Sequence, residues 1–171
     1  AGPLSDTPFL RPISVPMVFS GFNPAAVKLF ENAFRQKGLI PLMGGGGSMQ
    51  TVETGKSPRI DMHTLEPGSA IGAQLIRGDF NMSGTGTVTY RNDKTILAFG
   101  HPYLWSGALN IPMTQADIIT VIPDQASSTK IGNVTDVVGS VLWDHTNGLY
   151  GKLGDTAQMI PVVIDFHAGD Q

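Results

Sequence analysis

The sequence lacks cysteine and is poor in charge. Without cysteine the chain can form no disulfide, no thiolate metal site and no cysteine nucleophile. Charged residues make up 15% of the 171 residues, well below the share of about 25% in an average globular domain. The formal net charge is -3, and no basic run could follow a nucleic-acid backbone. These features argue against nucleic-acid binding.

Long apolar runs are missing as well. No run reaches the roughly 18 residues that a membrane-spanning helix needs, and no signal peptide is visible, so we expect no transmembrane segment in this chain. Glycine and proline are abundant, with 21 and 12 copies, and the hydrophobic content is 41%. This composition favours a real core built from short strands and tight turns over one built from long helices.

The N-terminal part predicts a β-α-β unit. Residues 13–20 are apolar and β-branched and predict a strand, in which Pro16 suggests an edge position or a bulge. Asn23 suits a helix N-cap, Pro24 suits the first helical position, and Gly38 suits the position after the helix ends. The spacing of apolar residues predicts that one face of this helix is buried. That face consists of Ala26, Val27, Phe30, Ala33 and Phe34.

A short strand over residues 39–43 completes the unit, and a glycine-rich stretch, GGGGS, follows at residues 44–48. We interpret this stretch as a natural loop, although an engineered flexible linker has the same composition. The predicted organisation is a β-α-β unit with its loop (residues 1–48), a linker or long arm (residues 49–67) and a β-barrel (residues 68–171).

From residue 68 the pattern is β. Alternating and apolar runs predict about seven strands, at spacings typical of a small barrel or sandwich, and closure into a barrel would remove exposed edges. Asn92-Asp93 and Asn147-Gly148 are signals for hairpin turns. We therefore expect a mainly β fold, a barrel of six or seven strands with the β-α-β unit packed on it. The strands are expected at residues 71–75, 85–90, 95–99, 118–122, 137–143, 149–153 and 159–166.

His101 is the main candidate for chemistry. It follows an apolar strand directly, in the sequence TILAFGHPY of residues 95–103, and Gly100 before it permits an unusual φ. A strand end would hold the side chain rigidly and a loop mouth would leave it exposed, which suits a general base. A histidine after a strand is nevertheless more often structural.

Short motifs lie on both sides of His101. They are EPGSAIG (66–72), GTGTVTY (84–90), LAFGHP (97–102), VGSV (138–141), TNGLYG (146–151) and MIPV (159–162). Their order resembles the SpoIVB family of serine peptidases, which has a PG-x-x-IG opening, a GTVT strand, a GH motif, a G-x-I…NT-x-GI-x-G segment and a PIPV strand. The resemblance covers residues 66–166.

The resemblance implies one half of a chymotrypsin-like double barrel, in which His101 is the base of a serine triad and is oriented by a carboxylate. The family's nucleophile lies in a GMSGSP-type motif beyond the PIPV strand, and nothing in this chain reads G-x-S-G-S. We therefore expect a serine peptidase-like domain that is incomplete or inactive as this chain. The family also implies a bacterial protein that acts outside the cytoplasm on a protein or peptide.

Other residues of the chain offer weaker alternatives. Ser106 lacks the signature of a nucleophile elbow, and a dyad of Lys130 with Ser127 or Ser128 is less expected than a polar turn. Tyr103 and Trp105 are equally suited to a peptide-docking patch and to the core. Four candidate carboxylates could orient His101. These are Asp117, Asp124, Asp136 and Asp144.

We expect no cofactor and no metal site, because the four histidines are far apart in the sequence. These are His63, His101, His145 and His167. The alternative function is a non-catalytic peptide- or partner-binding module of a bacterial surface protein. An exposed His101 beside an open cleft would favour the peptidase, and a His101 that is buried and bonded within its own loop would favour the alternative.

Overall fold

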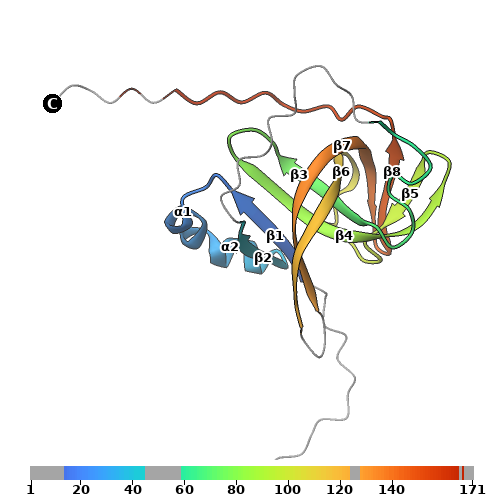
Figure 1. Cartoon of the computed structure of the whole chain (residues 1–171). Coiled ribbons are helices and arrows are strands. Elements are labelled where there is room, and N and C mark those ends of the chain that lie inside the picture. The colour runs from blue at the N-terminus through green and yellow to red at the C-terminus, as the bar shows by residue number, and fades with distance from the viewer. Residues whose placement is uncertain (1–13, 45–58, 124–127, 166, 168–171) are drawn as a thin grey trace, which may run out of the picture.

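The computed structural model of the chain describes residues 14–44, 59–123, 128–165 and 167 (Figure 1). Within these ranges all eight strands belong to one sheet, two short helices lie beside it, and six strands close into an antiparallel barrel. The mainly β fold with a small barrel is confirmed. The elements are β1 (Val15–Ser20), α1 (Pro24–Leu29), α2 (Glu31–Gln36), β2 (Leu39–Met43), β3 (Ala70–Ile76), β4 (Asn81–Asn92), β5 (Thr95–Ala98), β6 (Gly107–Ile122), β7 (Thr129–His145) and β8 (Gly148–Leu153).

The barrel closes because β4 pairs with both β3 and β5. The strand order is β4-β3-β6-β7-β8-β5, and the pairing of β5 with β4 completes the ring. Met113 of β6 is fully buried inside, next to Gly139 of β7 and Gly151 of β8. A Cβ atom at either glycine would lie within 2.8 Å of the Met113 side chain, so these two glycines make room for it.

The N-terminal unit extends the barrel sheet. Strand β1 pairs in parallel with β2 and antiparallel with β4. The N–H of Val15 donates to the Gly38 carbonyl, so the backbone groups of Gly38 point toward β1. Backbone groups alternate between the two sides of a strand, and those of Pro41 therefore point away from β1, toward the open edge of β2. Since proline has no N–H, it limits pairing at this edge. The backbone of Pro16 points toward β4 on the other side of β1. Its missing N–H removes no hydrogen bond of the sheet, because the pairing of β1 with β4 begins at Met17.

The helical segment forms two helices that meet at Phe30. Asn23 caps α1 as expected, with its side-chain oxygen accepting from the N–H of Ala25 at 2.9 Å. Val27 is buried and Phe34 packs against the core, but the prediction of a single buried face was wrong for Ala26, Phe30 and Ala33, which are exposed. The backbone leaves helical geometry at Phe30, so one 3.6-residue period does not run through both helices. Neither helix has the length and apolar character needed to cross a membrane, and no other helix lies in the described ranges.

The barrel strands differ from the predictions at their ends. The expected strand at residues 118–122 is only the last part of β6, and β7 is longer than expected. The turns lie one residue away from their expected positions, at Asp93-Lys94 in one hairpin and at Thr146-Asn147 in the other.

The expected strand at residues 159–166 was wrong. Residues 159–165 lie in no strand and are exposed, and residue 166 lies outside the described ranges. Strand β8 ends at Leu153, and Gly154 then adopts a φ of 75°, a left-handed conformation in which the chain leaves the sheet. An apolar run can form a strand only where a neighbouring strand accepts its hydrogen bonds.

The segment expected to be a linker contributes to the core. Leu65 is fully buried and Thr64 is buried beside it, while residues 45–58 lie outside the described ranges. The stretch interpreted as a natural loop, residues 44–48, therefore lies outside the described residues except for Gly44.

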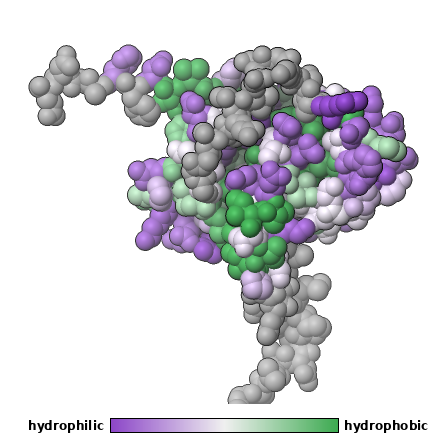
Figure 2. All heavy atoms as spheres, viewed as in Figure 1, coloured by the Kyte–Doolittle hydropathy of each residue, from purple (hydrophilic) through white to green (hydrophobic). Residues whose placement is uncertain are grey.

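The hairpin of β6 and β7 reaches beyond the barrel. Strand β7 contacts β4 and β1, and the outer half of the hairpin projects past the barrel (Figure 1). We call this half the arm and define it as residues 116–122 of β6 and 129–134 of β7. An apolar patch lies over the arm in the space-filling view (Figure 2). Its exposed apolar side chains are Ile118, Ile119, Val121 and Ile122.

Candidate functional site

His101 lies in the loop between β5 and β6, and the carboxylate of Asp144 on β7 holds this loop. Asp144 is only 4% exposed. Its two oxygens accept hydrogen bonds from the backbone N–H groups of Tyr103 (2.8 Å), Leu104 (2.7 Å) and Ser106 (3.1 Å). Hydrogen bonds from backbone N–H groups to a carboxylate are among the strong ones in proteins, so Asp144 fixes the path of the backbone just after His101.

Tyr103 anchors the same loop in the barrel interior. Its ring occupies the space left by Gly84, where a Cβ atom would lie 2.4 Å from the ring. Its hydroxyl donates to the Ala73 carbonyl at 2.9 Å and lies 3.3 Å from the Met17 sulfur. Burial strongly raises the pKa of the Tyr103 phenol. The loop is therefore fixed by a buried side chain as well as by Asp144.

Two residues of the loop have strained backbone conformations. Phe99 has a φ of 74° and Trp105 a φ of 58°, a region that residues with a Cβ atom rarely adopt. The ring of Phe99 covers Gly86, where a Cβ atom would clash with it at 2.5 Å. Backbone strain of this kind persists only where the surroundings enforce it, and it clusters at functional sites.

The ring of His101 is half-buried and oriented by its own loop. Its Nδ1 lies 2.8 Å from the Pro102 carbonyl oxygen, and the Phe99 ring lies edge-on at 5.8 Å between centroids. A carbonyl oxygen can only accept, so Nδ1 carries the proton of the neutral imidazole. The second nitrogen, Nε2, is then the acceptor, which is the tautomer that a general base requires.

In the part of the chain that the structure describes, no triad is assembled around His101. Among the described residues, only the Pro102 carbonyl lies within hydrogen-bonding distance of the ring. Asp144 serves backbone N–H groups instead, and Asp117 and Asp136 are exposed on the β6–β7 hairpin. Asp124 lies outside the described ranges.

Ser106 and Lys130 of the weaker alternatives are not hydrogen-bonded to the His101 ring. Ser106 is exposed, and its backbone N–H is used by Asp144. The ammonium group of Lys130 donates to the hydroxyl of Thr87 at 2.6 Å. Ser127, one candidate partner of that lysine, lies outside the described ranges.

The two aromatic residues after His101 have different roles. Tyr103 belongs to the core, whereas Trp105 is 68% exposed at the surface. Tyr103 is therefore a core residue, whereas a docking role for Trp105 stays a prediction. Two further rings, those of Trp143 and His145 on β7, are stacked with their centroids 5.4 Å apart.

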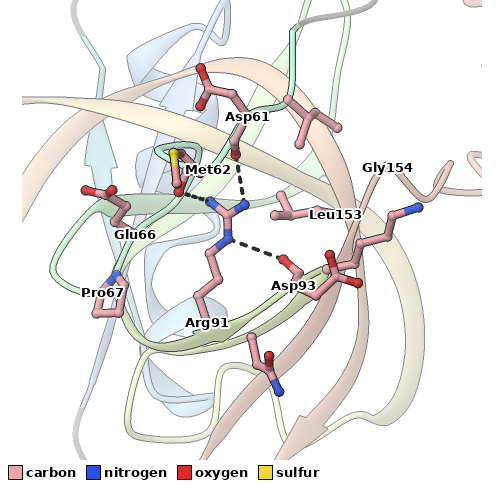
Figure 3. Close-up of a pocket in the computed structure, with 11 residues that line it drawn as sticks. Asp61, Met62, Glu66, Pro67, Arg91, Asp93, Leu153 and Gly154 are labelled. Atoms are coloured by element: carbon pink, nitrogen blue, oxygen red, sulfur yellow. Dashed lines mark hydrogen bonds between the residues drawn. The ribbon is translucent and has the colours of Figure 1, made fainter.

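A pocket with a volume of about 920 Å³ lies away from His101 and is organised by Arg91 of β4 (Figure 3). The guanidinium group donates to the backbone carbonyls of Asp61 (2.8 Å), Met62 (2.9 Å), Asp93 (3.3 Å) and Thr64. Arg91 thereby attaches the segment before β3 to the β4–β5 hairpin. Nothing in the sequence pattern of residues 49–67 had indicated this role.

Side chains at the rim of this pocket form a local network. The N–H of His63 donates to Asp61 at 2.9 Å, and this bond lowers the pKa of the Asp61 carboxyl. The ring of His63 lies 2.6 Å from a Glu66 oxygen. The described part of the chain contains no group of three or more potential metal ligands.

Comparison of the chain with protein-family models, with curated proteins and with solved structures found no match.

Proposed function

We propose that this chain is the histidine-bearing barrel of a SpoIVB-type serine peptidase that acts on a protein or peptide outside the bacterial cytoplasm. The observation that supports the proposal is the orientation of His101. Its Nδ1 proton is held by the Pro102 carbonyl at 2.8 Å, which leaves Nε2 as the acceptor, in a loop that Asp144 and Tyr103 keep rigid.

In this proposal Nε2 of His101 takes the proton from a serine hydroxyl as the serine attacks the peptide carbonyl. It then returns the proton to the leaving amine. Pro102 supplies a neutral carbonyl where a triad has a carboxylate, so it orients the ring but stabilises the imidazolium cation less. Serine and carboxylate come from sequence outside this chain, and the carboxylate takes the place of the Pro102 carbonyl at Nδ1 when the triad assembles.

A second candidate is a non-catalytic module that binds a peptide or a partner domain. The half-buried ring of His101 and its bond within its own loop favour this candidate. In addition, no hydroxyl or carboxylate of the described residues is hydrogen-bonded to the ring, which also favours this candidate. The barrel would then serve as a rigid support and the His101 loop as part of its binding surface.

A fluorophosphonate probe, which labels activated serines, separates the candidates. We expect this chain to remain unlabelled. We expect the full-length natural protein to be labelled and the His101→Ala variant of that protein to lose the label. A full-length protein that is folded and unlabelled would support the binding module instead. Labelling of this chain alone, abolished by Ser106→Ala, would contradict the assignment of the nucleophile to other sequence.

A further inference from the structure

Strand β6 has an open edge in the arm. In the barrel half, β6 pairs with β7 on one side and with β3 on the other, but the pairing with β3 ends at Gln115. Beyond that residue, the described pairings of β6 are with β7 alone. We call the unpaired side of residues 116–122 the arm edge. Its backbone groups have no strand beside them in the part of the chain that the structure describes (Figure 1).

The arm edge lacks the protection that exposed edge strands usually have. Folded proteins guard such edges with proline, with charged side chains or by covering them. The edge of β2 carries Pro41, whereas residues 118–122 contain neither proline nor a charged residue. They expose four apolar side chains instead (Figure 2). An unguarded apolar edge is the kind that a further strand covers.

Residues 159–165, which we call the tail, have the complementary property. The tail lies in no strand, and Ile160, Val162 and Val163 are 87%, 75% and 83% exposed. It is rich in the β-branched residues that favour strands and is uncharged up to Ile164. The tail and the arm edge each span seven residues. The chain therefore contains an edge without a strand and a strand-like segment without an edge.

Pro161 determines which side of the tail can pair. Backbone N–H groups alternate between the two sides of an extended chain, so those of Ile160, Val162 and Ile164 point to one side. Position 161 lies on the other side, where proline supplies no N–H. The first side is complete, and the side of Pro161 suits an outer edge. The tail can thus add one strand to a sheet and end the sheet there.

The tail cannot reach the arm edge of its own chain. The N–H of Gln158 donates to the side-chain oxygen of Asn110 at 3.3 Å, which holds the start of the tail at the barrel half of β6. Ile160 therefore lies within about 7 Å of Gln158, whereas Ile118 lies about 26 Å beyond Asn110 along the strand. In Figure 1 the tail runs along the side of the molecule away from the tip of the arm. A pairing of the two needs a second molecule.

We propose that the tail of one copy of this chain adds a strand to the arm edge of a second copy, and that the exchange is reciprocal. Each chain offers one tail and one arm edge, so a two-fold symmetric dimer uses both. Main-chain hydrogen bonds supply affinity in such strand addition, and the apolar side chains of both segments are removed from water. The pairing involves neither His101 nor a nucleophile, so it goes beyond the proposed function and is tested separately from it.

The first test is sedimentation equilibrium of this chain over a range of concentrations, where we expect a monomer–dimer equilibrium. Val162→Pro removes an N–H on the pairing side of the tail and should weaken dimerisation about tenfold or more. Val163→Pro is the matched control, because it makes the same change on the side of Pro161 and should leave the dissociation constant unchanged. Both residues lie outside the sheet, so neither change should affect folding.

A chain that is monomeric at all concentrations would overturn the proposal. So would a dimer that responds equally to the two prolines, or to neither, because the strand pairing requires one side of the tail only.

A mixing experiment tests the reciprocal exchange. Ile119→Lys places a charge on the arm edge and should weaken dimerisation as Val162→Pro does. In an equimolar mixture of the two variants, the intact tail of the first can pair with the intact arm edge of the second. We expect the mixture to contain more dimer than either variant alone. A mixture as monomeric as its components would contradict the exchange.

A spin label locates the tail. The chain has no cysteine, so Val163→Cys provides a single labelling position. A nitroxide on this residue, in copies without ¹⁵N, should broaden the amide signals of residues 116–122 in ¹⁵N-labelled parent chains mixed with them. Broadening confined to β2 or to other strands would assign the tail to a different edge and overturn the proposal.

Discussion

The two halves of the β6–β7 hairpin are both rich in apolar residues but have very different surroundings. In the barrel half, β6 also pairs with β3, and β7 also pairs with β8. Met113 and Val141 of this half are completely buried. In the arm, the described pairings of the two strands are only with each other, and Ile119 and Val121 are 59% and 49% exposed.

The comparison shows what neighbours contribute to a strand. A two-stranded ribbon is marginal in water by itself and needs further strands or a packed face. The barrel half has both, whereas in the arm Lys130 of β7 reaches Thr87 of β4 and residues 117–122 of β6 are exposed. The free energy of folding should therefore depend strongly on the barrel half and weakly on the arm.

The largest effect should come from Asp144, at the barrel end of β7. Asp144→Ala removes the acceptor of three backbone N–H groups in a buried position, and hydrogen bonds to a charged group contribute about 1.5–3 kcal/mol each. We expect a loss of about 4 kcal/mol in the free energy of unfolding, measured by urea denaturation. Asp136→Ala, an exposed change on the same strand, is the control and should alter it by less than about 0.5 kcal/mol. A loss of similar size in both variants would contradict the anchoring role.

The direct test of the comparison is the same side-chain truncation, valine to alanine, made once in each half. Val141→Ala removes two buried methyl groups and should lower the free energy of unfolding by about 2 kcal/mol. Val121→Ala makes the same chemical change in the arm and should lower it by less than about 0.5 kcal/mol. Equal losses would mean that the arm folds as an integral part of the barrel.

A smaller effect should appear at alkaline pH and concerns Tyr103, which ties the His101 loop to the barrel half. Burial raises its pKa in the folded state above the ordinary value of 10.0, so above that pH the unfolded chain releases a proton that the folded chain retains. Stability contributed by the neutral phenol is complete below pH 10 and falls as the pH rises further. The slope is about 1.4 kcal/mol per pH unit.

Tyr103→Phe isolates this contribution, because phenylalanine retains the ring and has no proton to lose. Thermal unfolding of the two proteins between neutral and alkaline pH should show a steeper decline for the parent. Parallel curves would mean that Tyr103 titrates normally and is not held in the interior.

The candidate site could be predicted only in part from the sequence. The position of His101 at the end of an apolar strand was evident, since local pattern alone defines β5 and its exit. The partner of its ring was not, because the Pro102 carbonyl reaches Nδ1 only through the loop conformation that Asp144 enforces from more than 40 residues away. The role of Arg91 was not predicted either. All four of its acceptors are backbone carbonyls, three of them in the remote segment of residues 61–64. Every residue has such a carbonyl, so the pattern of side chains does not indicate which ones accept.

By itself, the sequence determined the strand-rich class, the parallel pair around a helical segment, the Asn23 cap and the positions of most barrel strands, because these follow from local periodicity, caps and turns. Only the tertiary structure decided whether an apolar run became a strand in the sheet. Residues 118–122 pair with β7 and residues 159–165 pair with no described strand, although both are rich in β-branched residues. The physical reason is that the hydrogen bonds and buried surface of a strand belong to its neighbours as much as to the strand itself.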